Sequence, residues 1–122
     1  MIFENINQIN LNNNGSWENK VFLTFDMDWC GDKVLSFILD ILERYNIKAT
    51  FFVTHETTLL TRMRINPNIE LGIHPNFNPL LNGDFQYGKN IDEVVQYYTR
   101  IVPEAVSVRS HSLTISTPIL NV

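Results

Sequence analysis

Two aspartates separated by one residue close a short apolar run, in the string Val21-Phe22-Leu23-Thr24-Phe25-Asp26-Met27-Asp28. Residues i and i+2 of an extended backbone point to the same side, so the carboxylates of Asp26 and Asp28 would face one site. One carboxylate can hold a hard or borderline metal ion while the other stays free as a general base. The pair therefore points to metal-assisted acid–base chemistry.

The three histidines of the chain follow other apolar runs in the same way. Thr54 and His55 follow one run, His74 the next, and Arg109 and His111 the last. Imidazoles suit zinc or a related divalent ion, and an arginine can clamp a carboxylate and keep it ionised. Taken singly, an aspartate that ends a strand is most often a cap or turn residue, and such a histidine is usually structural. Their shared placement favours a genuine site.

Apolar runs predict the elements that would position these side chains. Buried parallel strands are expected over residues 21–26, 48–54, 69–74 and 105–109. Helical spacing predicts helices over 33–45, 57–65 and 91–101, and a last helical turn after Ser112. Asp32 is the expected N-cap of the first helix, whose buried face would hold Val34, Ile38, Ile41, Leu42 and Tyr45. Residues 75–90, rich in proline, asparagine and glycine, predict a long loop.

The alternation of strand and helix predicts an α/β fold with a parallel β-sheet and right-handed crossovers. Ligands of such folds bind outside the carboxyl ends of the strands, where these polar residues gather. We expect an N-terminal lead-in over residues 1–20 and one domain over 21–122.

Composition bounds the remaining function classes. The chain has 122 residues and a net charge of −4, with no basic run, which argues against a nucleic acid as partner. No apolar run approaches the ~18 residues of a membrane span, and the N-terminal residues lack the charge of a signal peptide. The single cysteine, Cys30, cannot form an internal disulfide. A cytoplasmic protein is the default expectation.

Several strings resemble the polysaccharide deacetylases, carbohydrate esterase family 4, also called the NodB-homology superfamily. Thr24-Phe25-Asp26-Met27-Asp28 looks like an Asp-x-Asp variant of the family's first motif, and Lys48-Ala49-Thr50-Phe51-Phe52-Val53 is similar to its second strand. Glu70-Leu71-Gly72-Ile73-His74 resembles the approach to its metal motif, and Val108-Arg109-Ser110-His111-Ser112 stands where the family has its arginine motif. The His-Pro-Asn-Phe and Arg-Ser-His-Ser strings are similar to a WbmS-like subgroup associated with surface polysaccharide of the O-antigen type.

This resemblance implies metal-assisted hydrolysis of an N-acetyl group on a sugar, with a divalent, zinc- or cobalt-like metal. Asp26 would be the general base, Arg109 would orient it, and Asp28 and His74 would bind the metal. Thr54, His55 and Asn76 are expected to bind the sugar or polysaccharide substrate.

The sequence departs from the family at the remaining ligand. Asn78, a weaker neutral ligand, occupies the place of the second metal histidine, so metal binding is expected to be weak or absent, roughly micromolar at best. His111 would either supply the lost imidazole as part of the catalytic set or bond within its own loop.

The resemblance also implies about half of a deacetylase-type (β/α) barrel, because the family's late motifs would lie beyond Val122. We expect a truncated chain, which the truncation could inactivate, whose uncovered apolar faces are buried in a homo-oligomer. A non-catalytic sugar-binding or oligomerisation half-barrel is one alternative. The other is a haloacid-dehalogenase-like phosphatase, with Asp26 as nucleophile, Asp28 as acid and a magnesium ion.

Overall fold

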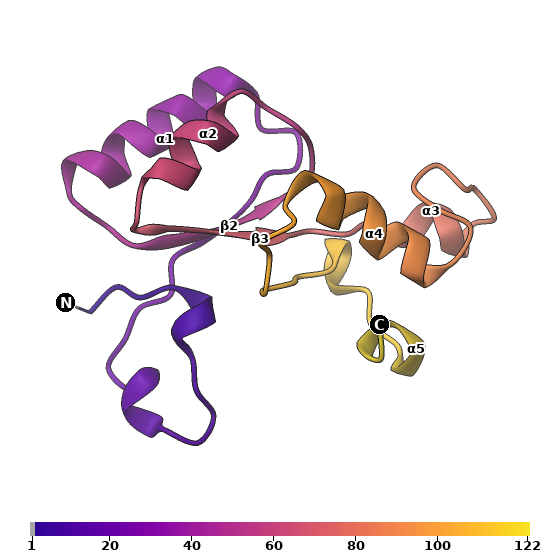
Figure 1. Cartoon of the computed structure of the whole chain (residues 1–122), viewed down its shortest axis with the longest axis horizontal. Coiled ribbons are helices and arrows are strands. Elements are labelled where there is room, and N and C mark those ends of the chain that lie inside the picture. Colours follow the sequence, from indigo (N-terminus) through magenta and orange to yellow (C-terminus); the bar gives the residue numbers. More distant parts are fainter. Residues whose placement is uncertain (1) are drawn as a thin grey trace.

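The computed structural model describes residues 2–122. Its sheet has three parallel strands in the order β1-β2-β3, at Thr24–Asp26, Ala49–Val53 and Ile69–Ile73. The helices are α1 (Asp32–Arg44), α2 (Leu59–Ile65), α3 (Asn78–Leu81), α4 (Ile91–Ile101) and α5 (Thr117–Leu120), as Figure 1 shows. Short 3₁₀ turns lie at Ile6–Gln8, Asn14–Ser16 and His111–Leu113. This alternation confirms the α/β class with a parallel sheet.

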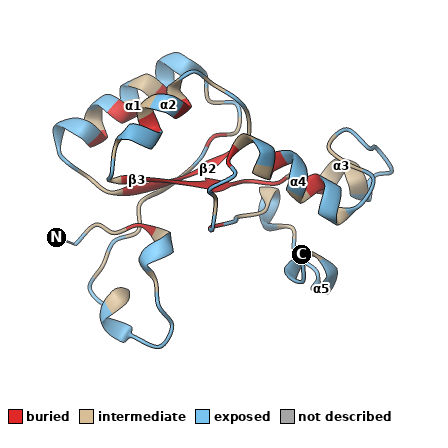
Figure 2. Cartoon of the chain, viewed as in Figure 1, coloured by how far each residue is buried: buried red, intermediate tan, exposed pale blue. Residues whose placement is uncertain are grey.

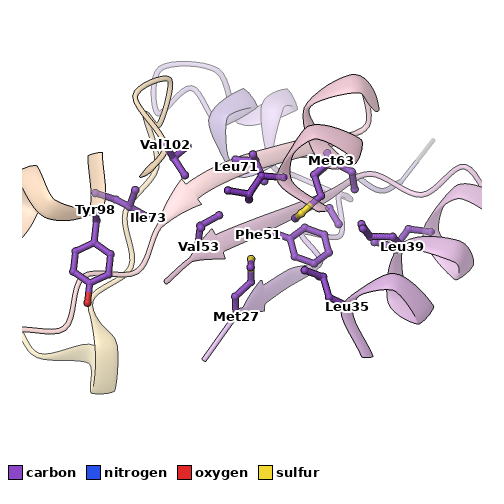
Figure 3. Packing of buried hydrophobic residues seen from close by; sticks show 14 of the residues in the cluster. Met27, Leu35, Leu39, Phe51, Val53, Met63, Leu71, Ile73, Tyr98 and Val102 are labelled. Carbon is purple, nitrogen blue, oxygen red and sulfur yellow. The ribbon is translucent and has the colours of Figure 1, made fainter. Parts of the chain in front are cut away.

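The core lies where α1 and α2 cover one face of the sheet. In Figure 1 the two helices lie side by side above β2 and β3, and the N-terminal segment lies below them. Phe51 and Leu71 of the sheet pack with Leu35, Leu39 and Met63 of the helices (Figure 3). Every residue of β2 and β3 is buried (Figure 2), as expected of central parallel strands without alternating polarity.

The buried face of α1 differs from the expected one. Leu35, Leu39 and Leu42 are the buried residues, with a spacing that puts them on one face, whereas Val34 and Tyr45 are exposed. The spacing of Leu35, Leu39 and Leu42 is as helical as that of the expected set, and packing against the sheet selects between the two faces. Gly31, not Asp32, is the N-cap, and Asp32 begins the helix.

The segment 105–109 is not a full fourth strand. Val108 forms a single parallel bridge with Ile73, whose N–H donates to the Ser107 carbonyl and whose carbonyl accepts from the Arg109 N–H. The Ala105 N–H instead donates to Val102 in a turn, and the Arg109 carbonyl bonds the ring of His74. Because these backbone groups have other partners, the ladder does not extend.

Two further boundaries differ from expectation. The first strand begins at Thr24, not residue 21, because Val21 pairs with Phe3 of the N-terminal segment. The expected loop 75–90 contains the short helix α3, with Pro79 in its first turn.

A buried carboxylate joins the N-terminal segment to the amino end of the sheet. Glu70, 6% exposed, accepts hydrogen bonds from the hydroxyls of Thr50 (2.7 Å) and Ser107 and from the backbone N–H of Asn7 (3.0 Å). The Thr50 hydroxyl also accepts from the N–H of Ile6. Each bond links a different chain segment, so Glu70 organises the end of the sheet opposite the functional residues.

Candidate active site and metal centre

The residues singled out from the sequence gather at the carboxyl edge of the sheet. Asp26 ends β1, with Asp28 two residues later, Thr54 follows β2, and His74 follows β3. Arg109 reaches the same edge from the bridge between Val108 and Ile73. Because the strands are parallel, their carboxyl ends lie on one side of the sheet, as predicted from the sequence.

Asp28, His74 and His111 form a compact cluster of three metal-type donors. One donor atom from each lies within 4.8 Å of the other two. Oδ2 of Asp28 is 2.9 Å from Nε2 of His74 and 3.2 Å from Nδ1 of His111. Two imidazoles and one carboxylate are the donor set of a three-ligand zinc-type site that leaves a position for water or substrate.

Hydrogen bonding fixes which nitrogen of His74 faces this cluster. Its Nδ1 lies 2.6 Å from the backbone carbonyl of Arg109, which can only accept, so Nδ1 carries the proton and donates. In the neutral ring, Nε2 then presents its lone pair to Asp28. Two lone pairs facing each other across 2.9 Å need a proton or a cation between them. A carbonyl that orients the other ring nitrogen is also the usual support of a ligating histidine.

Asp26 is held beside the cluster by Arg109. Nε and Nη2 of the guanidinium donate to Oδ1 of Asp26 at 2.9 and 2.6 Å, and Nη1 donates to the Thr24 hydroxyl at 3.1 Å. The guanidinium lies over the Phe52 ring, 4.4 Å from its centroid, which fixes its plane. Oδ1 of Asp26 is 3.7 Å from Nδ1 of His74. A carboxylate paired with a guanidinium thus lies next to the donor cluster without being part of it.

The side chain of Asn78 bonds a residue other than the three donors of the cluster. Its side-chain carbonyl accepts from the Thr114 hydroxyl at 3.2 Å, and its backbone N–H donates to the side chain of Asn76. His111 instead brings its ring to Asp28, because its backbone N–H donates to the carbonyl of Pro75 at 2.8 Å. Of the two roles left open for His111, the geometry favours that of replacement imidazole.

A cavity of about 380 Å³ opens beside the cluster, with Asp28 and His111 in its wall. Thr54, His55 and Asn76 also line it, and the Thr54 hydroxyl lies 2.7 Å from Nδ1 of His55. These three expected substrate-binding residues therefore share one space with the donor cluster.

The cavity is also lined by three aromatic residues that were not predicted as site residues from the sequence: Trp29, Tyr87 and Tyr98. Tyr98 is buried, and its hydroxyl accepts from the backbone N–H of Asn76 at 3.2 Å. Burial raises the pKa of Tyr98 to about 12, so the hydroxyl stays protonated at neutral pH. The position of Trp29 directly after the candidate site residue Asp28 could have indicated that it lines the site. Tyr98 gave no such indication, because aromatic residues at helical spacing normally belong to the core.

Comparison with known proteins identifies the family. Residues 23–122 match the family model described as WbmS-like polysaccharide deacetylase. The chain belongs to this family. A crystal structure from Bordetella bronchiseptica, assigned as a polysaccharide deacetylase involved in O-antigen biosynthesis (WbmS), is 47% identical, with a TM-score of 0.90. The match covers 98% of this chain and 49% of the Bordetella chain. No curated protein matches the sequence.

Membership in the WbmS-like family confirms the resemblance to polysaccharide deacetylases and gives no support to the haloacid-dehalogenase-like alternative. The chain spans about half the length of the Bordetella structure and reproduces that half closely, which agrees with the expected half of a deacetylase fold. Within residues 2–122, no helix has the length and apolar character needed to cross a membrane.

Proposed function

We propose that the chain carries the metal and base half of a sugar deacetylase site, which hydrolyses an N-acetyl group of a surface-polysaccharide sugar. The donor cluster of Asp28, His74 and His111, with the arginine-held Asp26 beside it, carries the proposal. Family membership supplies the reaction class, and the donor set fits a divalent, zinc- or cobalt-like ion.

When bound, such an ion supplies Lewis acidity, which polarises the acetyl carbonyl and makes water more acidic. Asp26 accepts the proton of the attacking water, since Arg109 holds its carboxylate adjacent to the cluster. Arg109 keeps the base oriented by holding Oδ1 with two of its nitrogens. The C–N bond then breaks as the proton that Asp26 took from water passes to the leaving nitrogen, so that acetate and a free amine leave.

The remaining polar residues of the cavity hold the sugar. Thr54, His55 and Asn76 line the space beside the cluster and offer groups that match sugar hydroxyls. The hydrogen bond between the Tyr98 hydroxyl and the Asn76 N–H fixes the loop that carries Asn76. These residues orient the acetamido group toward Asp26, an arrangement that lowers the barrier by positioning alone.

Metal binding by the purified chain tests the centre. The Asn78 substitution alone predicts micromolar zinc binding at best, but His111 adds a second imidazole to the donor cluster. Calorimetric titration with zinc, and the visible absorption of bound cobalt, are therefore expected to give one site with a Kd below about 1 μM, a binding free energy of more than about 8 kcal/mol. His111→Ala is expected to weaken binding by at least about 10-fold, since loss of an outer partner alone costs that much. Asn78→Ala is the matched control, because Asn78 bonds Thr114 instead. Weakening by Asn78→Ala with none by His111→Ala would refute this donor set.

Acetate release from an N-acetylated sugar tests the chemistry. Asp26→Asn is expected to lower the rate by about 10²–10⁴-fold and to leave the zinc affinity unchanged, because Asp26 is the base and not a ligand. A zinc-loaded chain that binds the sugar but releases no acetate would favour the non-catalytic sugar-binding alternative.

A further inference from the structure

Trp29 is the most exposed large apolar residue of the described chain, with 94% of its surface accessible. It follows Asp28 directly and lies in a tight turn, closed by a hydrogen bond of 3.1 Å from the Cys30 N–H to the Met27 carbonyl. Met27 is buried in the core, and its N–H donates to the carbonyl of Phe52 in β2. The turn is therefore fixed at its base while the indole projects into solvent.

The backbone of Trp29 is left-handed, with φ of 53°. This region favours glycine or asparagine in such a turn, and a bulky residue there is unfavourable. The exposed indole gains no packing energy that could offset this unfavourable backbone conformation. We take the conformation as an indication that the ring has a functional role.

The indole lies at the entrance of the proposed site. Trp29 lines the cavity of about 380 Å³, and its ring meets the ring of His111 edge-on, with 6.3 Å between centroids and 79° between planes. A sugar ring placed on the indole face would thus lie within reach of the donor cluster, since an acetamido group extends a few bonds from its ring.

The neighbours of Trp29 indicate what kind of molecule covers it. Hydrogen-bonding residues, Thr54, His55 and Asn76, line the same cavity. A protein-docking patch is a contiguous apolar area, whereas a cavity that combines an exposed indole and two tyrosines with hydrogen-bonding groups suits a ring with an apolar face and a polar rim. A pyranose is such a ring: its axial C–H bonds meet the negative aromatic face, and its hydroxyls point outward to polar partners.

We propose that Trp29 is a stacking platform for the pyranose ring that carries the acetamido group. The inference rests on the proposed function, because the deacetylase site defines where the acetyl group must lie. It adds a specificity-determining residue and restricts the substrate to cyclic N-acetylhexosamines that present an unobstructed C–H face.

Tryptophan fluorescence can observe the platform directly. The chain has two tryptophans, and Trp17→Phe leaves Trp29 as the sole reporter. Titration of this variant with methyl N-acetyl-β-D-glucosaminide is expected to give a saturable change of emission, and acetamide, which has the acetyl group without the ring, is expected to give none. Trp29→Phe, which leaves Trp17 as the reporter, is the control and is expected to show no change.

Affinity for the same glycoside, measured by calorimetry, separates stacking from folding. Trp29→Gly suits the left-handed turn, so it is expected to fold at least as stably as wild type while its Kd rises by about 10-fold. Trp29→Phe retains a smaller aromatic face, and its Kd is expected to lie in between. Zinc affinity is expected to change less than glycoside affinity in both variants, because Trp29 meets the His111 ring only edge-on.

The outcomes separate this inference from the proposed function. A Trp29→Gly protein that binds the glycoside as tightly as wild type overturns the platform, as does a zinc-binding protein without glycoside-dependent emission. Glycoside stacking on Trp29 in a protein that binds no zinc would support the platform and contradict the proposed function. Absence of both zinc and glycoside binding would overturn both.

Discussion

Replacement of Glu70 tests whether its buried carboxylate holds the N-terminal segment to the sheet. Glu70→Leu leaves the hydroxyls of Thr50 and Ser107 and the N–H of Asn7 without their acceptor. Each buried polar group left unpaired costs about 1–3 kcal/mol. Thr50 keeps one partner, because its hydroxyl also accepts from Ile6, and Asn7 is exposed, so water can reach its N–H. The main loss is then at buried Ser107, and we expect a total of about 2–4 kcal/mol.

Glu70→Gln is the milder variant and keeps the shape. Its carbonyl oxygen can accept from Thr50 and Asn7, and its NH₂ can donate to the Ser107 hydroxyl, which also accepts. The three hydrogen bonds become weaker because their acceptor no longer carries a charge. The folded state also no longer has to bury that charge, so we expect the free energy of unfolding to fall by only about 1–2 kcal/mol.

Urea unfolding followed by circular dichroism measures both losses, with exposed Glu56→Gln as the control. Small domains have only about 5–15 kcal/mol in total, so Glu70→Leu can approach the limit of folding, and Glu70→Gln keeps the test measurable. If Glu70→Leu cost less than about 1 kcal/mol, the reasoning from unpaired donors would be refuted. Zinc affinity of Glu70→Gln is expected to equal that of wild type, because Glu70 lies at the opposite end of the sheet.

Gly72→Ala is expected to destabilise the chain by about 1–3 kcal/mol in the same assay, because the new Cβ would lie 2.6 Å from the Ser107 carbonyl oxygen; wild-type stability would contradict this close approach. Burial raises the pKa of Tyr98 to about 12, so the free energy of unfolding is expected to fall as pH rises from about 10 to about 12, and Tyr98→Phe is expected to remove that slope; identical slopes would disprove the linkage. Exposed Val106 and Val108 predict a homo-oligomer in sedimentation, reduced by Val108→Lys; a wild-type monomer of 14.2 kDa at micromolar concentration would exclude it.

The sequence predicted well those strands and helices that are determined by the hydrophobic pattern of their own residues. Strands β2 and β3 are mainly apolar runs, interrupted by Thr50 and Glu70, and α4 has the predicted bounds, with Val94 and Tyr98 as its buried residues. The segment 105–109 also reads as a strand, but its pairing depends on which distant groups reach its backbone, such as the ring of His74. No local pattern carries that information.

The candidate site divides in the same way. Asp26, Asp28 and His74 lie together because the ends of parallel strands share an edge, a rule that the sequence alone can apply. The position of His111 depends on the 3₁₀ turn His111–Leu113, in which Ser112 and Leu113 are left-handed. Neither residue type favours that conformation, so nothing in the sequence separated a replacement imidazole from a loop contact.

Arg109 serves the two parts of the site through chemically different groups. Its guanidinium holds Asp26, and its main-chain carbonyl fixes the tautomer of His74. Every amino acid has that carbonyl, so a substitution that preserves the backbone here can change the partner of Asp26 without changing the orientation of the His74 ring. The orientation of the proposed base and the affinity of the proposed metal site are therefore expected to be adjustable separately at position 109.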